Sequence, residues 1–376
     1  MIRAPALAAL AVIAGACGGG GESQPDAADV DDEVCAVADG TGVSWDWTQP
    51  FCTKLSSYRF LDFDGSYQQP NDGVIPFDLN TPLFSDYAFK WRYLYLPSGT
   101  SMTYHDTDTF EMPVGAALLK TFWYPADVRN PDQGVRLIET RLLARYASGW
   151  EGITYLWNDE QTEAYATVAG ASVPVTWIDS DGQDRSVDFA VPNTNQCRHC
   201  HEEQDDVMRP VGPKARHLNR DFDYDGQAVN ILTKLAEVGY LTGAPADPAA
   251  APRAPVFDDP LTGTAEERAR AWLDINCAHC HNPAGPARTS GLDLRAAQTD
   301  PYSYGICKTP VAAGQGSCGL QYDIVPGMPD QSILICRLES VDPSVRMPEL
   351  GRSLVHTESA ALIRSWITAL PGTPCN

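Results

Sequence analysis

Basic residues are scarce in this chain of 376 residues. Lys and Arg number 27 against 49 Asp and Glu, which gives a formal net charge of −22. Nucleic acid and anionic membrane surfaces repel a field of this sign, so neither is expected as a partner. A protein with a basic docking face is the better electrostatic match. The same acidity also fits the simpler purpose of keeping an exported protein soluble.

The sequence also lacks an apolar run long enough to cross a bilayer. The apolar run at residues 6–16 follows Arg3 and is typical of a signal peptide. Ile13-Ala14-Gly15-Ala16-Cys17 resembles the cleavage box of bacterial lipoproteins, although Ala14 stands where that box usually has Leu. We expect lipidation of Cys17, with ordinary signal cleavage as the alternative. The expected location is the periplasm or cell envelope, with the lipid anchor as the sole membrane contact.

Cysteine, in contrast, is plentiful, with 11 residues. Four lie in two Cys-x-x-Cys pairs and one is Cys17. An even remainder in an exported chain favours disulfides. By proximity in sequence we expect the pairs Cys35–Cys52, Cys307–Cys318 and Cys336–Cys375, with Cys307–Cys336 as an alternative pairing.

Histidine is rare, with 7 residues, yet a histidine follows each Cys-x-x-Cys pair directly. Two thiols at this spacing can add to the two vinyl groups of a haem, and the adjacent imidazole can bind the iron. The composition predicts roughly 0.006 such motifs per chain by chance. We therefore predict two covalently bound haem c groups. They are attached at Cys197, Cys200 and His201, and at Cys277, Cys280 and His281.

Zinc and a redox dithiol are the alternatives for these cysteines. A zinc ribbon places its two pairs about 15–20 residues apart. Here 76 residues separate Cys200 from Cys277, and zinc gives no reason for a histidine after both pairs. A thioredoxin-like dithiol lies at a strand-to-helix junction of an α/β fold, which the pattern around these motifs does not suggest.

The sixth iron ligand is predicted separately for each haem. For the second haem we favour Met347, which precedes a proline in the loop before the last predicted helix; Met328 is the rival, and either methionine could be core filler. For the first haem no candidate stands out, and an open position would permit peroxide or substrate chemistry. The candidates there are His217, Met208, His105, Met102 and Met112.

The predicted fold class is multidomain α+β. Alternating apolar and polar residues with frequent turn signals favour a β-sandwich-like domain over 45–191. Mostly α-helical cytochrome c-type haem domains are expected after it, with helices over 228–238, 265–276 and 358–369. The expected divisions are a signal peptide and lipobox (1–17), a tether (18–44), the β-rich domain (45–191), a first haem-binding segment (192–242), a Pro/Ala linker (243–260) and a cytochrome c-like domain (261–376).

Several longer strings of residues carry a family resemblance. The chain resembles a group of exported bacterial dihaem c-type cytochromes with an amino-terminal β domain. The resemblance implies haem binding and a redox function, and it implies no substrate. It rests on Asn80-Thr81-Pro82-Leu83-Phe84-Ser85-Asp86-Tyr87, Lys120-Thr121-Phe122, Glu139-Thr140-Arg141-Leu142-Leu143, Tyr155-Leu156-Trp157-Asn158, Asn195-Gln196-Cys197, Gly212-Pro213-Lys214-Ala215-Arg216 and Met347-Pro348-Glu349-Leu350-Gly351-Arg352.

Three functional hypotheses follow. The first is electron transfer through two haems to a redox partner protein with a basic docking face. The second is a haem enzyme, peroxidase-like, with a catalytic first haem fed by the second. The third is a binding module whose β domain recognises a partner while the haems are tethered to it. We favour the electron carrier over the enzyme.

Overall fold

The computed structural model describes residue 35, residues 42–202, 207–311 and 313–373, and residue 375. The predicted signal peptide, Cys17 and most of the tether lie outside the described residues. No helix within those described ranges is both long enough and apolar enough to span a bilayer.

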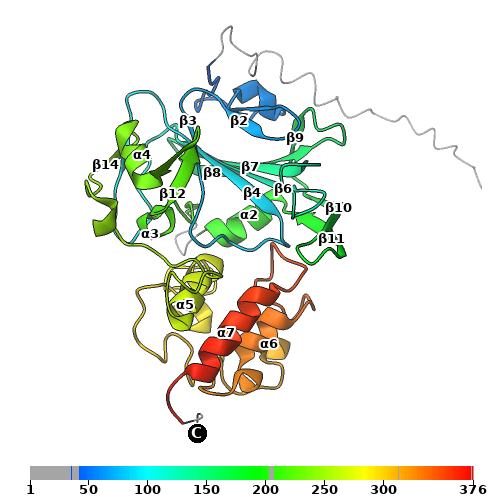
Figure 1. The fold of residues 1–376 in the computed structure, drawn as a ribbon, viewed down its shortest axis with the longest axis vertical. Helices are drawn as coiled ribbons and strands as arrows, with labels where there is room; N and C mark the ends of the chain where they lie inside the picture. The colour runs from blue at the N-terminus through cyan, green and yellow to red at the C-terminus, as the bar shows by residue number, and fades with distance from the viewer. Residues whose placement is uncertain (1–34, 36–41, 203–206, 312, 374, 376) are drawn as a thin grey trace, which may run out of the picture.

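A six-stranded antiparallel sheet dominates the upper part of the molecule (Figure 1). Its strands are rich in aromatic and β-branched residues, which pack well on a pleated surface. Because side chains alternate between the two faces, Leu119 and Thr121 point one way, and Lys120 and Phe122 the other. In spatial order the strands are β3 (Val74–Phe77), β4 (Phe89–Tyr95), β6 (Ala117–Tyr124), β7 (Arg136–Tyr146), β8 (Gly149–Trp157) and β9 (Ala164–Thr167).

One face of this sheet packs on an aromatic core that includes Trp45, Tyr58, Tyr93 and Tyr155. The Tyr58 and Tyr155 hydroxyls lie 2.9 Å apart, which satisfies two polar atoms inside that core. The elements that cover this face are η2 (Leu55–Tyr58), β1 (Leu61–Phe63) and β2 (Gln68–Pro70). A separate hairpin, β10 (Ala171–Ile178) and β11 (Asp184–Val191), packs on Phe122, Tyr124 and Ile138.

The next segment mixes short helices and strands. It contains α2 (Thr194–His201), α3 (Ala215–Leu218), β12 (Asp221–Tyr224), β13 (Gln227–Asn230), α4 (Ile231–Glu237), β14 (Leu241–Thr242) and η3 (Pro248–Ala250). The short strand β14 pairs in parallel with β5 (Met102–Thr103). The helix predicted over 228–238 begins only at Ile231, because residues 227–230 pair with 221–224 as a hairpin.

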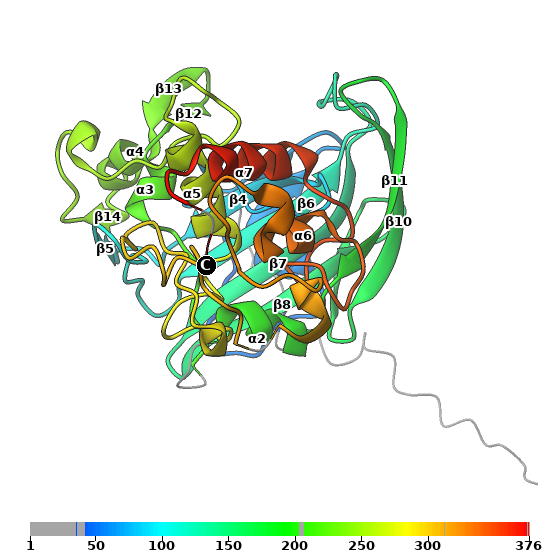
Figure 2. The ribbon, with the colours of Figure 1, turned by 90° about the horizontal axis from the view of Figure 1, so that it is seen from below.

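The carboxy-terminal part contains α5 (Ala265–Asn276), α6 (Ile333–Glu339) and α7 (Thr357–Ala369), with the turns η4 (Arg288–Ser290), η5 (Gly314–Ser317) and η6 (Pro329–Gln331). The helix predicted over 265–276 is confirmed, and Thr264 and Glu267 form a capping box at its start. The helix predicted over 358–369 is also confirmed and begins one residue earlier. Seen from below, these three helices lie in front of the large sheet, and α2 lies close to β8 (Figure 2).

The predicted fold class is wrong. The chain is 21% helix and 27% strand, and the described residues form six α-helices, most of them short. Among the described helices, α5 and α7 have an amphipathic pattern long enough to support several helical turns. The rest of the carboxy-terminal half consists mostly of loops, short helices and 3₁₀ turns. The described residues do not form a two-sheet sandwich either. Six of the 14 described strands join one sheet and the other eight form four separate two-stranded pairs, while helices cover part of the polar face of the large sheet.

Three disulfides cross-link the described residues. Cys35–Cys52 is paired as predicted, whereas the other pairs are Cys307–Cys375 and Cys318–Cys336. The prediction from proximity failed because the chain end returns to the loop after η4, across a separation of 68 residues. Three disulfides indicate an oxidising location, extracellular or periplasmic.

Segment 80–87 is joined to the carboxy-terminal helices through His356. Its ring stacks on Phe84 with centroids 4.3 Å apart, and its Nδ1 accepts a hydrogen bond of 3.1 Å from Trp272 Nε1. Burial lowers the pKa of His356 to about 4, so the neutral ring is the form that the folded protein favours.

This depressed pKa predicts a pH dependence of stability. Below the ordinary value of about 6.5, the unfolded state binds the His356 proton and the folded state does not. The free energy of unfolding should therefore fall as pH drops from about 6.5 to about 4, by up to about 3 kcal/mol. Urea unfolding of the wild type and His356→Gln at pH 7.5 and 4.5 measures this. The variant should lose less stability on acidification, and equal losses would contradict the prediction.

Candidate functional site

Helix α2 carries the first Cys-x-x-Cys-His motif. Asn193 and Gln196 form a capping box that starts the helix immediately before Cys197. The helix packs against β8, where Cys197 faces Thr154. Beyond this helix, the carbonyl oxygen of Arg209 lies 2.9 Å from His201 Nδ1.

The second motif begins where α5 ends. Cys277 is the C-cap residue of α5, and its N–H donates to Leu273 O at 2.9 Å. Asn282 then donates from Nδ2 to Ala278 O at 2.8 Å, which holds the turn that carries the motif. His281 Nδ1 lies 3.0 Å from Ser290 Oγ.

Both motif histidines are oriented in the same manner. In each ring Nδ1 is the bonded nitrogen, which leaves Nε2 as the nitrogen able to bind a metal. Burial lowers the pKa of His201, and it lowers the pKa of His281 to about 4. Both imidazoles are therefore neutral near pH 7, which is the form that metal ligation requires.

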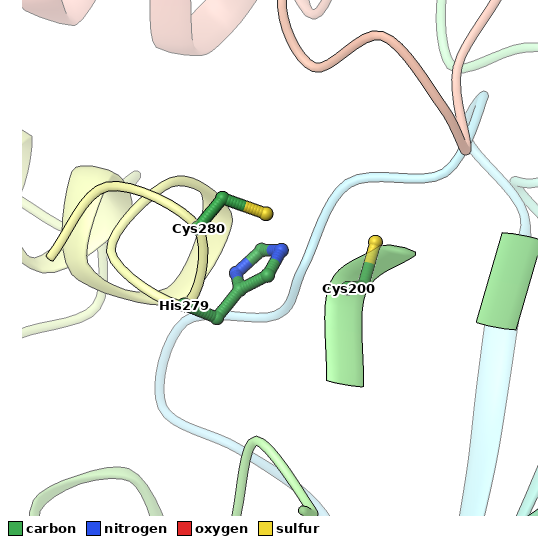
Figure 3. A group of neighbouring side chains, drawn as sticks. All are labelled: Cys200, His279 and Cys280. Atoms are coloured by element: carbon green, nitrogen blue, oxygen red, sulfur yellow. The ribbon is translucent and has the colours of Figure 1, made fainter. Parts of the chain in front are cut away.

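The two motifs, separated by 75 residues in the sequence, meet in space. The Sγ atoms of Cys200 and Cys280 and a ring nitrogen of His279 all lie within 4.8 Å of one another. Figure 3 shows Cys280 and His279, from the segment after α5, pointing toward Cys200 at the end of α2. A hydrogen bond from Cys280 and the neighbouring His279 lower the pKa of Cys200. The sequence pattern gave no sign of this contact.

The four motif cysteines fit covalent haem attachment. All four are free thiols, while the six other described cysteines are paired in disulfides. Burial raises the pKa of Cys277 to about 12 and also raises that of Cys197, so these two thiols stay protonated. These four thiols stay reduced although the other described cysteines form disulfides, and a neutral, oriented imidazole follows each pair. This is the set of groups that haem c attachment needs.

The loop that carries Met347 lies beside both motifs. The Met347 N–H donates to Arg337 O at 3.0 Å, and the Arg337 charge acts on His281. Two residues after Met347, Glu349 Oε2 lies 3.9 Å from His199 Nε2. The rival Met328 is 37% exposed at the start of η6. This placement suits Met347 as a ligand, and the ligation itself stays a prediction.

The candidate ligands of the first haem are scattered. His217 is buried and its Nε2 lies 3.0 Å from Asp274 Oδ2, so that nitrogen is already bonded. Met102 and Met112 are buried in a core around α3 and α4, and His105 is exposed beside Asp108. Met208 lies against β8, because a Cβ placed on Gly152 would come 3.3 Å from its Cε. Of the five candidates, Met208 lies against β8, the strand that also contacts the helix of the first motif.

Sequence reasoning missed a set of basic side chains on the sheet face nearest the motifs. These are Lys90, Arg92, Lys120 and Arg141, from β4, β6 and β7. The sequence could have indicated this set, because each of these basic residues interrupts a strand of mostly apolar or aromatic residues at a position that faces one side of the sheet.

Comparisons with known proteins add nothing to this chemistry. No family model matches the chain, and searches of curated proteins and of solved structures find no match either.

Proposed function

We propose that this chain is an exported dihaem c-type cytochrome that transfers electrons between two haems and a redox partner protein. The observation that carries the proposal is the proximity of Cys200 and Cys280, one from each motif. A thioether sulfur would be bonded to a former vinyl carbon at the edge of its haem, so two adjacent sulfurs would hold two haem edges close together. Neighbouring haem edges are what electron exchange between the two irons requires.

The chain contributes attachment and orientation. The thiols of each motif would attach one haem, and the adjacent histidine would bind its iron. The bonds from His201 to Arg209 and from His281 to Ser290 set the ring orientation and increase ligand basicity. When bound, the haem irons supply one-electron redox chemistry between their ferric and ferrous states.

The envelope setting belongs to the same proposal. An acylated Cys17 would tether the chain to a membrane surface, and the glycines that follow would give it reach. Formation of the disulfides and covalent attachment of haem outside the cytoplasm are mutually consistent. The net charge of −22 favours docking with a basic partner, and this attraction weakens as ionic strength rises.

Intact mass and optical spectra of protein from a host that attaches haem c test this function. The wild type should carry the mass of two haems. Cys277→Ser/Cys280→Ser should carry one, because each motif is attached independently. Cys318→Ser/Cys336→Ser is the matched control, since it also removes two cysteines yet leaves both haems. A wild-type mass equal to the bare processed polypeptide would reject the proposal.

A zinc site is the second candidate, because Cys200, His279 and Cys280 lie close enough to bind one metal ion. Zinc prefers four sulfur and nitrogen ligands in a tetrahedral arrangement, and this cluster offers three. His279→Ala against His281→Ala distinguishes the two candidates. A haem protein should lose the normal spectrum of one haem in His281→Ala only, whereas a zinc protein should lose bound zinc in His279→Ala. Metal analysis of the same samples reads out both results.

A further inference from the structure

The sheet face nearest the motifs carries a continuous row of cationic side chains. Lys120 of β6 lies opposite Arg92 of β4 on one side and opposite Arg141 of β7 on the other. In the next row, Phe122 lies between Lys90 and Glu139. All four cations therefore project from the same face, because they occupy paired positions of one antiparallel sheet.

Within the described residues, acidic partners satisfy only two of these four cations. Arg92 pairs with Asp78 and Arg141 with Glu139, each at 2.5 Å. Neither Lys90 nor Lys120 makes a salt bridge with any residue in the described ranges, and Lys90 Nζ donates to Ala88 O at 2.8 Å. Arg92 is only 6% exposed, and its Nη2 is a buried donor with no partner among the described residues.

The Phe122 ring packs among these cations but cannot neutralise them. Lys120 Nζ lies 4.8 Å, and Arg141 Cζ 4.4 Å, from the Phe122 ring centroid, with Lys90 Nζ farther away at 5.9 Å. Burial, with neighbouring like charges adding to it, lowers the pKa of Lys90 to about 7 and that of Lys120 well below its usual value. Lys90 and Lys120 are half-buried and pair with no carboxylate among the described residues, an arrangement that is costly for a cation, so this face is suited to receive an anion.

The cationic row leads away from the first motif. Thr154 of β8 lies opposite Arg141 in the sheet, and Cys197 packs against Thr154. The Arg141 charge acts on Cys197 and Cys200, and the Lys120 charge acts on His201. Beyond Arg141, the row continues through Lys120 to Arg92. A haem held by its vinyl edge at Cys197 presents its two carboxylates at the opposite edge of the ring.

We propose that Lys90, Arg92 and Lys120 form a carboxylate-binding site for the propionates of the first haem. The inference rests on the proposed function. Charge-assisted bonds from Lys and Arg to carboxylates are short and strong, and they match the unpartnered donors on this face. These bonds would fix the orientation of the haem and hold its propionates in the ionised form. A small inorganic oxyanion from solution offers the same chemistry and is the competing occupant.

Redox titration of the haem-loaded protein tests the site. The variants are Lys120→Gln, Lys90→Gln and Lys120→Arg, with the exposed Lys54→Gln as the matched control. Loss of a cation beside a propionate should shift one of the two midpoint potentials downward. It should also raise the propionate pKa, so that this potential becomes dependent on pH near neutrality. Lys120→Arg should restore the wild-type potential, and Lys54→Gln should leave both potentials unchanged.

Intact mass is measured first, because it distinguishes failure of the proposed function from failure of the carboxylate-binding site. Wild-type protein without haem would reject the proposed function. Two attached haems with unchanged potentials in both Lys→Gln variants would overturn the carboxylate site alone. A titration with inorganic phosphate tests the competing occupant. If phosphate shifts a midpoint potential of the wild type saturably and this shift is absent from Lys120→Gln, the site belongs to a diffusible oxyanion and the propionate assignment is overturned. If phosphate shifts neither midpoint potential, the propionate assignment is supported.

Discussion

Replacing Asp274 by alanine should lower the free energy of unfolding by about 3–5 kcal/mol, because it leaves the largely buried Arg216 guanidinium without its counter-ion and His217 Nε2 without its partner. Asp274 lies on α5 with only 2% of its side chain exposed. Its carboxylate accepts hydrogen bonds of 2.7 and 2.9 Å from Arg216 and lies 3.0 Å from His217 Nε2. It also accepts one from the Ala296 N–H at 3.0 Å.

These contacts tie the segment that follows the first motif to the helix that leads into the second. The Arg216 and His217 interactions hold the pKa of Asp274 far below its usual range, against the raising effect of burial. Loss of the carboxylate should therefore disturb the approach of α5 to Cys277 as well as global stability. We expect Asp274→Ala to attach less haem at the second motif than the wild type.

Urea unfolding and intact mass measure the two effects. Glu266→Ala is the matched control, since Glu266 is exposed on the same helix and its removal should cost less than about 1 kcal/mol. Asp274→Asn keeps the shape of the side chain and removes its charge, so its loss of stability should lie between the other two. A loss in Asp274→Ala no larger than in Glu266→Ala would show that the buried ion pairs do not hold the segments together.

Replacing Met347 by histidine should lower the midpoint potential of the second haem. A thioether ligand favours the ferrous state more than an imidazole does, and axial ligands set haem potentials over a range of roughly 0.8 V. The shift should be a substantial part of that range and should leave the first haem unchanged. Redox titration followed optically measures the shift, and the thioether-to-iron absorption band should disappear.

Met328→His is the matched control for this prediction. Met328 belongs to the turn before η6 and is 37% exposed, so its replacement should alter neither haem. The reverse result, with Met328→His shifting a potential and Met347→His doing nothing, would exchange the two assignments. Unchanged potentials in both variants would place the sixth ligand elsewhere.

Local patterns predicted the parts of this molecule that depend on neighbouring residues. The helix over 265–276 was predictable because Thr264 and Glu267 provide its cap and Trp272 and Leu273 its buried stripe. The Cys35–Cys52 pairing followed from a separation of 17 residues. The Cys307–Cys375 and Cys318–Cys336 pairings were missed because the return of the chain end decides which thiols meet.

The predicted fold class failed for a related reason. Alternating strands between 45 and 191 were visible in the sequence, but alternation does not say whether a polar face meets water or another part of the chain. Lys120 and Arg141 occupy polar positions of these strands, and in the structure they lie on a face near the first motif. The segments after Pro192 fold largely as loops and short elements because few of them carry a sustained helical stripe.

The sequence alone carries the prediction of haem attachment, because thiol spacing and an adjacent imidazole are properties of five consecutive residues. Only the tertiary structure brought Cys200 to Cys280 and set a row of cations beside the first motif. Those placements depend on how a sheet and distant helices pack around shared apolar cores. That packing is a collective result of many weak contacts, which no short stretch of sequence encodes.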